Sequence, residues 1–213
     1  MWSQISIINY LIGPILTWLP LIFKFLVLIL IVLPVAGQRY RCFKFFAHRF
    51  FSYSRLLIFV LVAGFAYALL LTGVQYYVWR LSLMGRYLLP PYQGMGYFIH
   101  YSYNHFYLAS LLSLLVAAMF FGLMSLLRKS GRISIGAADL SLCFLLALLS
   151  TWPGIIIFLA LFLIFSLVAA VVNVFRFKIA EFSPFWPLIS ASALTILFGR
   201  ILIVILRLGG LIV

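Results

Sequence analysis

The chain contains two carboxylic acids, and their scarcity makes them the first residues to test for chemistry. Asp139 stands in the stretch GAADLSL at the start of a long apolar segment, and Glu181 follows in a later polar stretch. Two carboxylates that share one proton can hydrolyse a peptide bond, because one activates water as a base while the other acts as an acid. A single carboxylate in the first turn of a helix has a simpler use, since the positive end of the helix dipole favours it. Position alone leaves both interpretations open.

The amino-acid composition indicates the environment of these two acids. The chain is 67% hydrophobic and 8% charged, with a mean hydropathy of +1.27, whereas about 25% of the residues of a soluble domain are charged. Residues 106–127 carry no charge over a length that crosses a bilayer. We therefore predict an all-helical, polytopic membrane protein in which residues 1–213 form a single membrane domain. An acid at the middle of a membrane would cost roughly 3 kcal/mol and would usually mark a functional site.

Apolar runs separated by charged or Pro/Gly-rich breaks predict six membrane spans. They lie near residues 11–36, 56–79, 106–127, 136–152, 155–175 and 185–206. Ten lysines and arginines fall in the loops 37–55, 128–135 and 176–184, and the opposite side has Arg80, Arg86 and Arg207. Because basic loops stay in the cytoplasm, this asymmetry predicts an inner-membrane protein with its N- and C-termini outside.

Two cations fall inside predicted spans rather than in loops. Lys24 lies in the first span, and Arg200 lies in the sixth. We expect each of them to face the helix bundle or to extend toward a membrane surface, because a charge exposed to lipid is unfavourable. Neither cation needs a ligand to explain it.

The net charge of +13 indicates membrane lipid rather than nucleic acid as a partner, because the cations are divided among several short loops. The basic and aromatic segment 37–55 is expected to lie among lipid headgroups. Cys42 and Cys143 show no CxxC spacing, and His100 and His105 have no carboxylate or thiol nearby in the sequence. The sequence therefore predicts no metal site and no cofactor.

Two motifs at a characteristic spacing resemble those of a known family. Gly136-Ala137-Ala138-Asp139 resembles the GxGD motif of intramembrane aspartic proteases, with Ala138 in place of the second glycine. Some 45 residues later, FSPFWPLISASALTILFG resembles the PFGPFLALGA segment of type IV prepilin peptidases and preflagellin peptidases. The matching residues are Pro184, Phe185, Pro187 and Leu188, while Trp186 takes the place of a small residue. The intervening DLSLCFLLALLSTWPG is also similar to the family, so that the resemblance covers about residues 130–206.

This resemblance implies a prepilin-peptidase-like helical bundle and an aspartic endopeptidase that removes leader peptides at the cytoplasmic membrane face. Such an enzyme needs a second carboxylate beside Asp139. The family's first aspartate would fall at the end of the first span, around Gln38 and Arg39, and neither residue is an acid. The paired CxxC motifs of the family's methyltransferase region do not occur in the sequence either, so leader methylation is not predicted.

Several interpretations of the missing acid stay open. In the first, Arg39 occupies the place of the lost aspartate and pairs with Asp139, which would hold the acid ionised and prevent proton sharing. In the second, Glu181 supplies the second carboxylate, although Lys178 competes for it as a partner. In the third, another subunit completes the pair. The fourth is that the resemblance is due to chance.

The leading hypothesis is a catalytically inactive, prepilin-peptidase-like protein that acts as a membrane subunit or scaffold of a pilus-like or secretion apparatus. Its partners would be membrane lipids and other protein subunits, and not nucleic acid. The alternative is an active endopeptidase that cuts a prepilin-like substrate through Asp139 and Glu181. A transporter subunit is a third class, but one aspartate and no polar stripe give it little with which to carry a solute.

Overall fold

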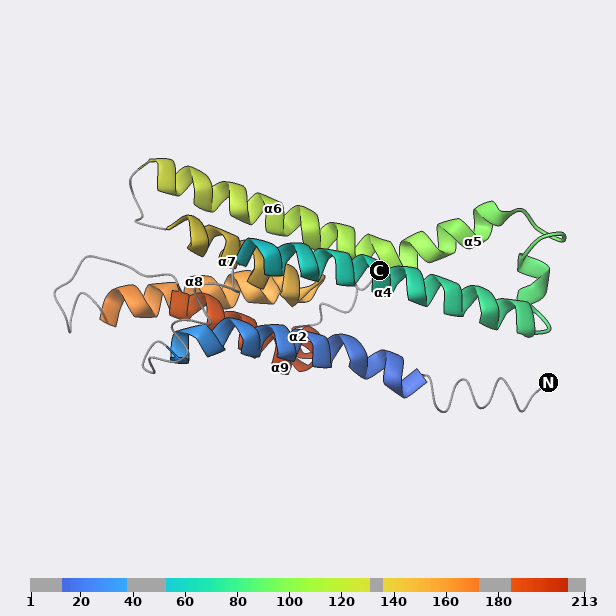
Figure 1. Cartoon of the computed structure of the whole chain (residues 1–213), viewed down its shortest axis with the longest axis horizontal. Helices are drawn as coiled ribbons and strands as arrows, with labels where there is room; N and C mark the ends of the chain where they lie inside the picture. The colour runs from blue at the N-terminus through green and yellow to red at the C-terminus, as the bar shows by residue number, and fades with distance from the viewer. Residues whose placement is uncertain (1–12, 38–52, 131–135, 173–184, 207–213) are drawn as a thin grey trace.

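The computed structural model describes residues 13–37, 53–130, 136–172 and 185–206, and every regular element within them is helical. The elements are α2 (Gly13–Gly37), α4 (Tyr53–Leu81), the 3₁₀ helix η2 (Gly85–Leu88), α5 (Met95–Ser102), the π-helical turn η3 (Tyr103–Tyr107), α6 (Leu108–Lys129), α7 (Ala137–Ser150), α8 (Gly154–Val172) and α9 (Phe185–Ile205). The long helices pack alongside one another in an elongated bundle (Figure 1). The predicted all-helical fold is confirmed for the described part of the chain.

Each of the six predicted spans overlaps an observed α-helix. Among the described residues, three helical segments are long and apolar enough to cross a membrane, namely α4, the continuous helix Met95–Lys129 and α8. The remaining apolar stretches are shorter and comprise Trp18–Val32, Asp139–Ser150 and Trp186–Gly199. The 14 residues of α7 rise only about 21 Å at 1.5 Å per residue, against about 30 Å for a hydrocarbon core. Three helices able to cross a membrane are thus observed, while six crossings stay a prediction.

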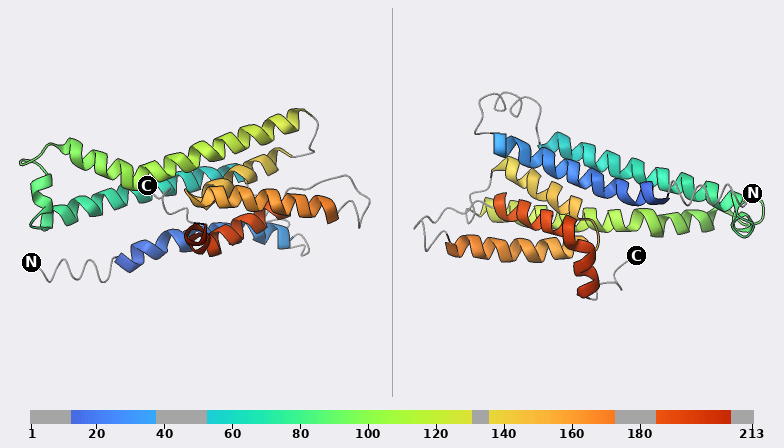
Figure 2. Two further views of the ribbon diagram at one scale, coloured as in Figure 1. Left: turned by 180° about the vertical axis from the view of Figure 1, so that it is seen from behind. Right: turned by 90° about the horizontal axis from the view of Figure 1, so that it is seen from below.

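The helix ends that border the three basic loops lie toward the same end of the bundle. These are the end of α2, the start of α4, the end of α6, the start of α7, the end of α8 and the start of α9 (Figures 1 and 2). Arg55, Arg128 and Lys129, the described cations of those loops, lie at these helix ends. The orientation in the membrane stays a prediction.

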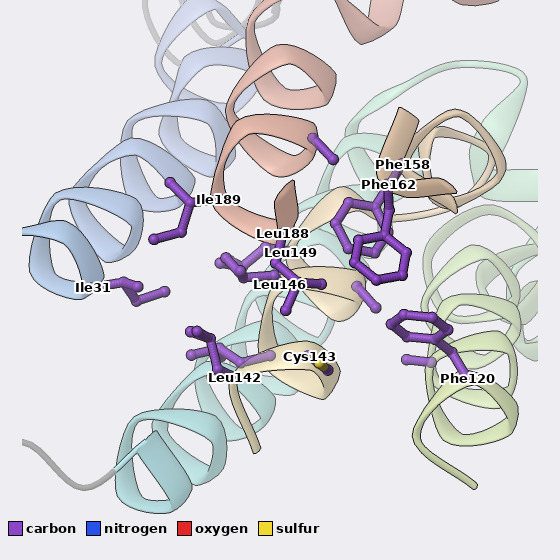
Figure 3. Close-up of a cluster of buried hydrophobic side chains, with 14 of the residues drawn as sticks. Ile31, Phe120, Leu142, Cys143, Leu146, Leu149, Phe158, Phe162, Leu188 and Ile189 are labelled. Carbon is purple, nitrogen blue, oxygen red and sulfur yellow. The ribbon is translucent and has the colours of Figure 1, made fainter. Parts of the chain in front are cut away.

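Helix α7 forms the centre of the hydrophobic core. It packs against α4, α6, α8 and α9, and its completely buried residues are Leu142, Cys143, Leu145, Leu146 and Ala147. A helix that is apolar on all sides needs neighbours on all sides, which explains this central place. Figure 3 shows Leu142 and Leu146 between α2, α9 and the aromatic residues of α6 and α8. There Phe120 meets Phe162 edge to face, with ring centroids 5.4 Å apart.

The third long helix begins earlier than its predicted span. It starts at Met95 rather than near residue 106, and it runs through α5 and η3 into α6. Trp79 at the end of α4 explains the early start, because its ring lies 5.4 Å from that of Phe98 and 4.8 Å from that of Tyr101. These aromatic contacts hold part of the segment between the second and third predicted spans against α4 as a helix. The π-helical turn marks the bend between α5 and α6 in Figure 1.

The central place of α7 predicts where a core truncation is most harmful. Leu146→Ala removes a completely buried side chain and should lower the free energy of unfolding by about 2–5 kcal/mol. Leu163→Ala on α8, where the side chain is 66% exposed, is the matched control and should cost about 0.5 kcal/mol or less. Unfolding titrations with SDS in mixed micelles measure both values. Equal losses for the two variants would contradict the central packing of α7.

Candidate functional site

Asp139 lies in the first turn of α7, where its carboxylate caps the start of the helix. Gly136 is the N-cap residue with an extended backbone, and Asp139 is the third helical residue. The Gly136 backbone N–H donates a hydrogen bond of 3.0 Å to Asp139 Oδ2. Glycine has no side chain with which to return the bond, so this is one half of a capping box. The geometry is that of the simpler interpretation, an anion held at the positive end of a helix.

Gly136 gives the carboxylate the room to approach the backbone. A Cβ atom at this position would lie 3.1 Å from Asp139 Oδ2, which is closer than the two atoms would normally pack. The first glycine of the GxGD-like motif therefore has a local structural purpose in this chain. Ala138 lies within the same helical turn.

The surroundings of Asp139 supply a phenol and a thiol rather than a second acid. Its carboxylate acts electrostatically on Tyr53, the first residue of α4, and on Cys143, one turn further along α7. Cys143 is completely buried in the core and is a free thiol. Asp139 is the only acid among the described residues, and Glu181 lies outside them. The described site therefore contains one carboxylate, which is partly exposed and is bound to the start of α7.

The structure brings the two halves of the peptidase-like motif onto neighbouring helices. Phe185 is the first residue of α9, and Pro187 is buried in its first turn, where proline is tolerated. The starts of α7 and α9 lie at the same end of the bundle (Figure 1), and the two helices pack together. Leu188 of α9 and Leu146 of α7 belong to the same buried cluster (Figure 3). Trp186, in the small-residue position of the motif, is 62% exposed.

Three residues of the predicted site lie outside the described part of the chain. They are Arg39, Glu181 and Pro184. The predicted ion pair between Arg39 and Asp139 and the predicted carboxylate pair with Glu181 therefore stay predictions.

The other end of α7 carries a contact that sequence analysis did not predict. Lys24 Nζ, from the middle of α2, donates a hydrogen bond of 2.8 Å to Thr151 Oγ1. Thr151 is the C-cap of α7 and adopts a positive φ of 49°, a conformation that is unfavourable for a β-branched residue. A cation at a helix C-terminus is stabilised by the negative end of the dipole. Lys24 thus faces the bundle, one of the two orientations expected for it.

The turn that follows Thr151 is held to α6 by a hydrogen bond. The Trp152 N–H donates to Ser113 Oγ of α6 at 2.6 Å, and the Ser113 hydroxyl donates to the Ala109 carbonyl at 2.7 Å. Pro153 and Gly154 of this turn are buried. Because its partners lie in the middle of α2 and inside α6, the turn is placed partway along the bundle and not at its end (Figures 1 and 2). Irregular backbone at such a depth requires protein partners, and these contacts supply them.

His100 and His105, which lie between the second and third predicted spans, make contacts within their own helical segment. His100 Nε2 lies 3.1 Å from Asn104 Nδ2, and His105 Nδ1 lies 3.0 Å from the Tyr101 carbonyl oxygen. The His105 ring stacks on Tyr101 with the ring centroids 4.0 Å apart. Within the described ranges, no three His, Cys, Asp or Glu side chains gather as a metal site would require.

Comparisons of the chain with protein-family models, with curated proteins and with solved structures gave no match. The resemblance to prepilin peptidases therefore rests on the motifs within residues 130–206 alone.

The contact between Lys24 and Thr151 can be tested by a double-mutant cycle. Lys24→Met and Thr151→Ala each remove one partner of a charge-assisted hydrogen bond, so their coupling energy should be about 1–2 kcal/mol. Thr72→Ala is the control partner for Lys24→Met, because the Thr72 hydroxyl bonds to Ala68 and Tyr107 instead. The control cycle should be additive. A Lys24–Thr151 coupling energy near zero would mean that the contact does not hold α2 to α7.

Proposed function

We propose that this chain is a multi-pass inner-membrane protein of prepilin-peptidase-like fold that has no peptidase activity. In this proposal it serves as a structural subunit of a pilus-like or secretion apparatus. The observation that carries the proposal is the hydrogen bond of 3.0 Å from the Gly136 N–H to Asp139 Oδ2. This bond gives Asp139, which stands at the aspartate position of the GxGD-like motif, a structural role at the start of a helix. That role requires no second catalytic acid.

The chemistry of aspartic peptidases explains why this use matters. Two carboxylates must lie close enough to share a proton, so that one is ionised and the other is protonated at the same time. In this chain one oxygen of Asp139 accepts the Gly136 N–H at the start of α7. In the proposal, Arg39 rather than a second acid is the other partner of this carboxylate. Without a carboxylate beside it, Asp139 has no group with which to share a proton.

The large buried core supports a scaffold role. Helix α7 is buried by four neighbouring helices, and a part-buried hydrogen bond from the Trp152 N–H to Ser113 Oγ links the turn after it to α6. Exposed apolar side chains remain on the outside of the bundle, including Phe65 of α4, Leu163 of α8 and Val204 of α9. Such surfaces are available to lipid tails and to the helices of other membrane subunits.

One observation favours the enzymatic alternative. The starts of α7 and α9 lie at the same end of the bundle (Figure 1), and Glu181 precedes the first residue of α9 by only four positions. A chain of four residues spans at most about 14 Å. In the alternative proposal, Glu181 and Asp139 form the catalytic pair.

A cleavage assay separates the two proposals. The purified chain is incubated in lipid vesicles with a prepilin-like substrate, alongside an active prepilin peptidase as the positive control. We expect the leader to be removed by the control enzyme only. Leader removal by this chain that is lost in both Asp139→Asn and Glu181→Gln would overturn the proposal and establish the peptidase. The subunit role is contradicted if the chain, extracted from its native membrane in a mild detergent, migrates alone on native gels.

A further inference from the structure

The end of the bundle opposite to the basic loops carries a cluster of aromatic and cationic side chains. We call residues 76–103 the hairpin tip; it comprises the end of α4, η2, the following turn, α5 and the first residue of η3 (Figure 1). We propose that the hairpin tip binds the phosphate headgroups of anionic lipids at the membrane surface. This inference depends on residence in a membrane, but it does not depend on the absence of peptidase activity.

A packed aromatic core makes the hairpin tip a fixed surface. The Trp79 ring stacks on Tyr97 with ring centroids 6.1 Å apart, and Phe98 meets Tyr76 edge to face at 5.5 Å. Gly85 closes the tight turn after α4, because a Cβ atom there would lie 2.9 Å from the backbone of Trp79. The Gly85 N–H also donates to Ser82 Oγ at 2.7 Å. The surface is therefore formed before any ligand binds.

The outer surface of the hairpin tip has the composition of a membrane interface. Its large exposed side chains are Tyr77, Leu83, Met84, Tyr87, Tyr92, Met95, Tyr97, Ile99 and Tyr103. Tyrosine has an apolar ring and a polar hydroxyl, so it is most stable where acyl chains meet headgroups. Met84 is 86% exposed and stands between the two arginines of the tip in the sequence. Exposed tyrosines beside exposed apolar side chains match a lipid surface better than bulk water.

Two arginines give this surface its charge. Arg80 and Arg86 are both exposed, and the Arg86 guanidinium lies 5.2 Å from the Tyr87 ring centroid and donates to its hydroxyl at 3.4 Å. The contact with Tyr87 orients the guanidinium and leaves other N–H groups to bind a phosphate, which arginine contacts through two donors. The only acids of the chain are Asp139 and Glu181, so no carboxylate of the hairpin tip competes for these cations. An anionic ligand complements this charge.

The lengths of the helices place this charge near a headgroup layer. Helix α4 has 29 residues and the helix Met95–Lys129 has 35, which correspond to about 43 Å and about 52 Å. The hydrocarbon core is about 30 Å thick, and the bilayer with its headgroups is about 40–45 Å thick. A hairpin whose apolar part fills the hydrocarbon core therefore extends into or past the headgroups. This depth favours lipid over a soluble acidic protein as the ligand.

A fluorescence titration can test the proposal on the full-length chain. Met84→Cys carries a bimane label in a Cys42→Ala background, while Cys143 is retained because it is completely buried. Short-chain phosphatidylglycerol is titrated into the protein in a neutral detergent. We expect saturable binding, and Arg80→Gln and Arg86→Gln should each weaken it about fivefold. Arg128→Gln, which removes an exposed cation at the opposite end of the bundle, is the control and should leave the binding unchanged.

Each other outcome of the titration overturns the proposal. An equal response to short-chain phosphatidylcholine would show that the headgroup charge is not recognised. An equal response to inorganic phosphate would show a site for the free ion rather than for lipid. The bimane signal could also stay unchanged with every one of these ligands while circular dichroism shows folded protein. This result would mean that the hairpin tip does not bind lipid and is a surface for an acidic protein instead.

Discussion

Helix α7 ends partway along the bundle, where the turn that follows it bonds to α2 and α6. A charged side chain interacts with each end of the backbone dipole of α7. Such interactions are stronger in a low dielectric than in water. Asp139 accepts the Gly136 N–H at the start, and Lys24 donates to Thr151 at the end. The chain has one aspartate in all, and it uses that residue at the start of its most buried helix.

The arrangement of the other helices follows from this central helix. The contact between Lys24 and Thr151 attaches α2 to the end of α7, and the bond from Trp152 to Ser113 attaches the same turn to α6. Apolar packing on α4, α8 and α9 then surrounds the helix. A charge at the middle of α2 is costly in contact with lipid, and this cost disfavours any structure in which α2 separates from α7. The polar contacts thus select one packing among many that apolar side chains alone would allow.

The sequence predicted well what depends on neighbours along the chain. Five of the six apolar runs became helices near their expected bounds, because length and composition determine such segments. The exception is the run 106–127. The place of Asp139 in a first turn was one of two open interpretations. The partner of Lys24 could not be predicted, since it lies 127 residues away along the chain. The helical start at Met95 was missed for a similar reason, because it depends on the packing of Trp79 against Phe98 and Tyr101.

Amide hydrogen exchange of α7 tests the central claim most directly. In lipid nanodiscs, Lys24→Met should speed the exchange of the last amides of α7 about fivefold, as the loss of roughly 1 kcal/mol from a helix terminus would do. The amides in the middle of α4, a helix that contributes neither partner of the bond between Lys24 and Thr151, should keep their rates. Unchanged exchange in α7, or equal acceleration in α7 and α4, would contradict the account that charges at its two ends hold this helix in place.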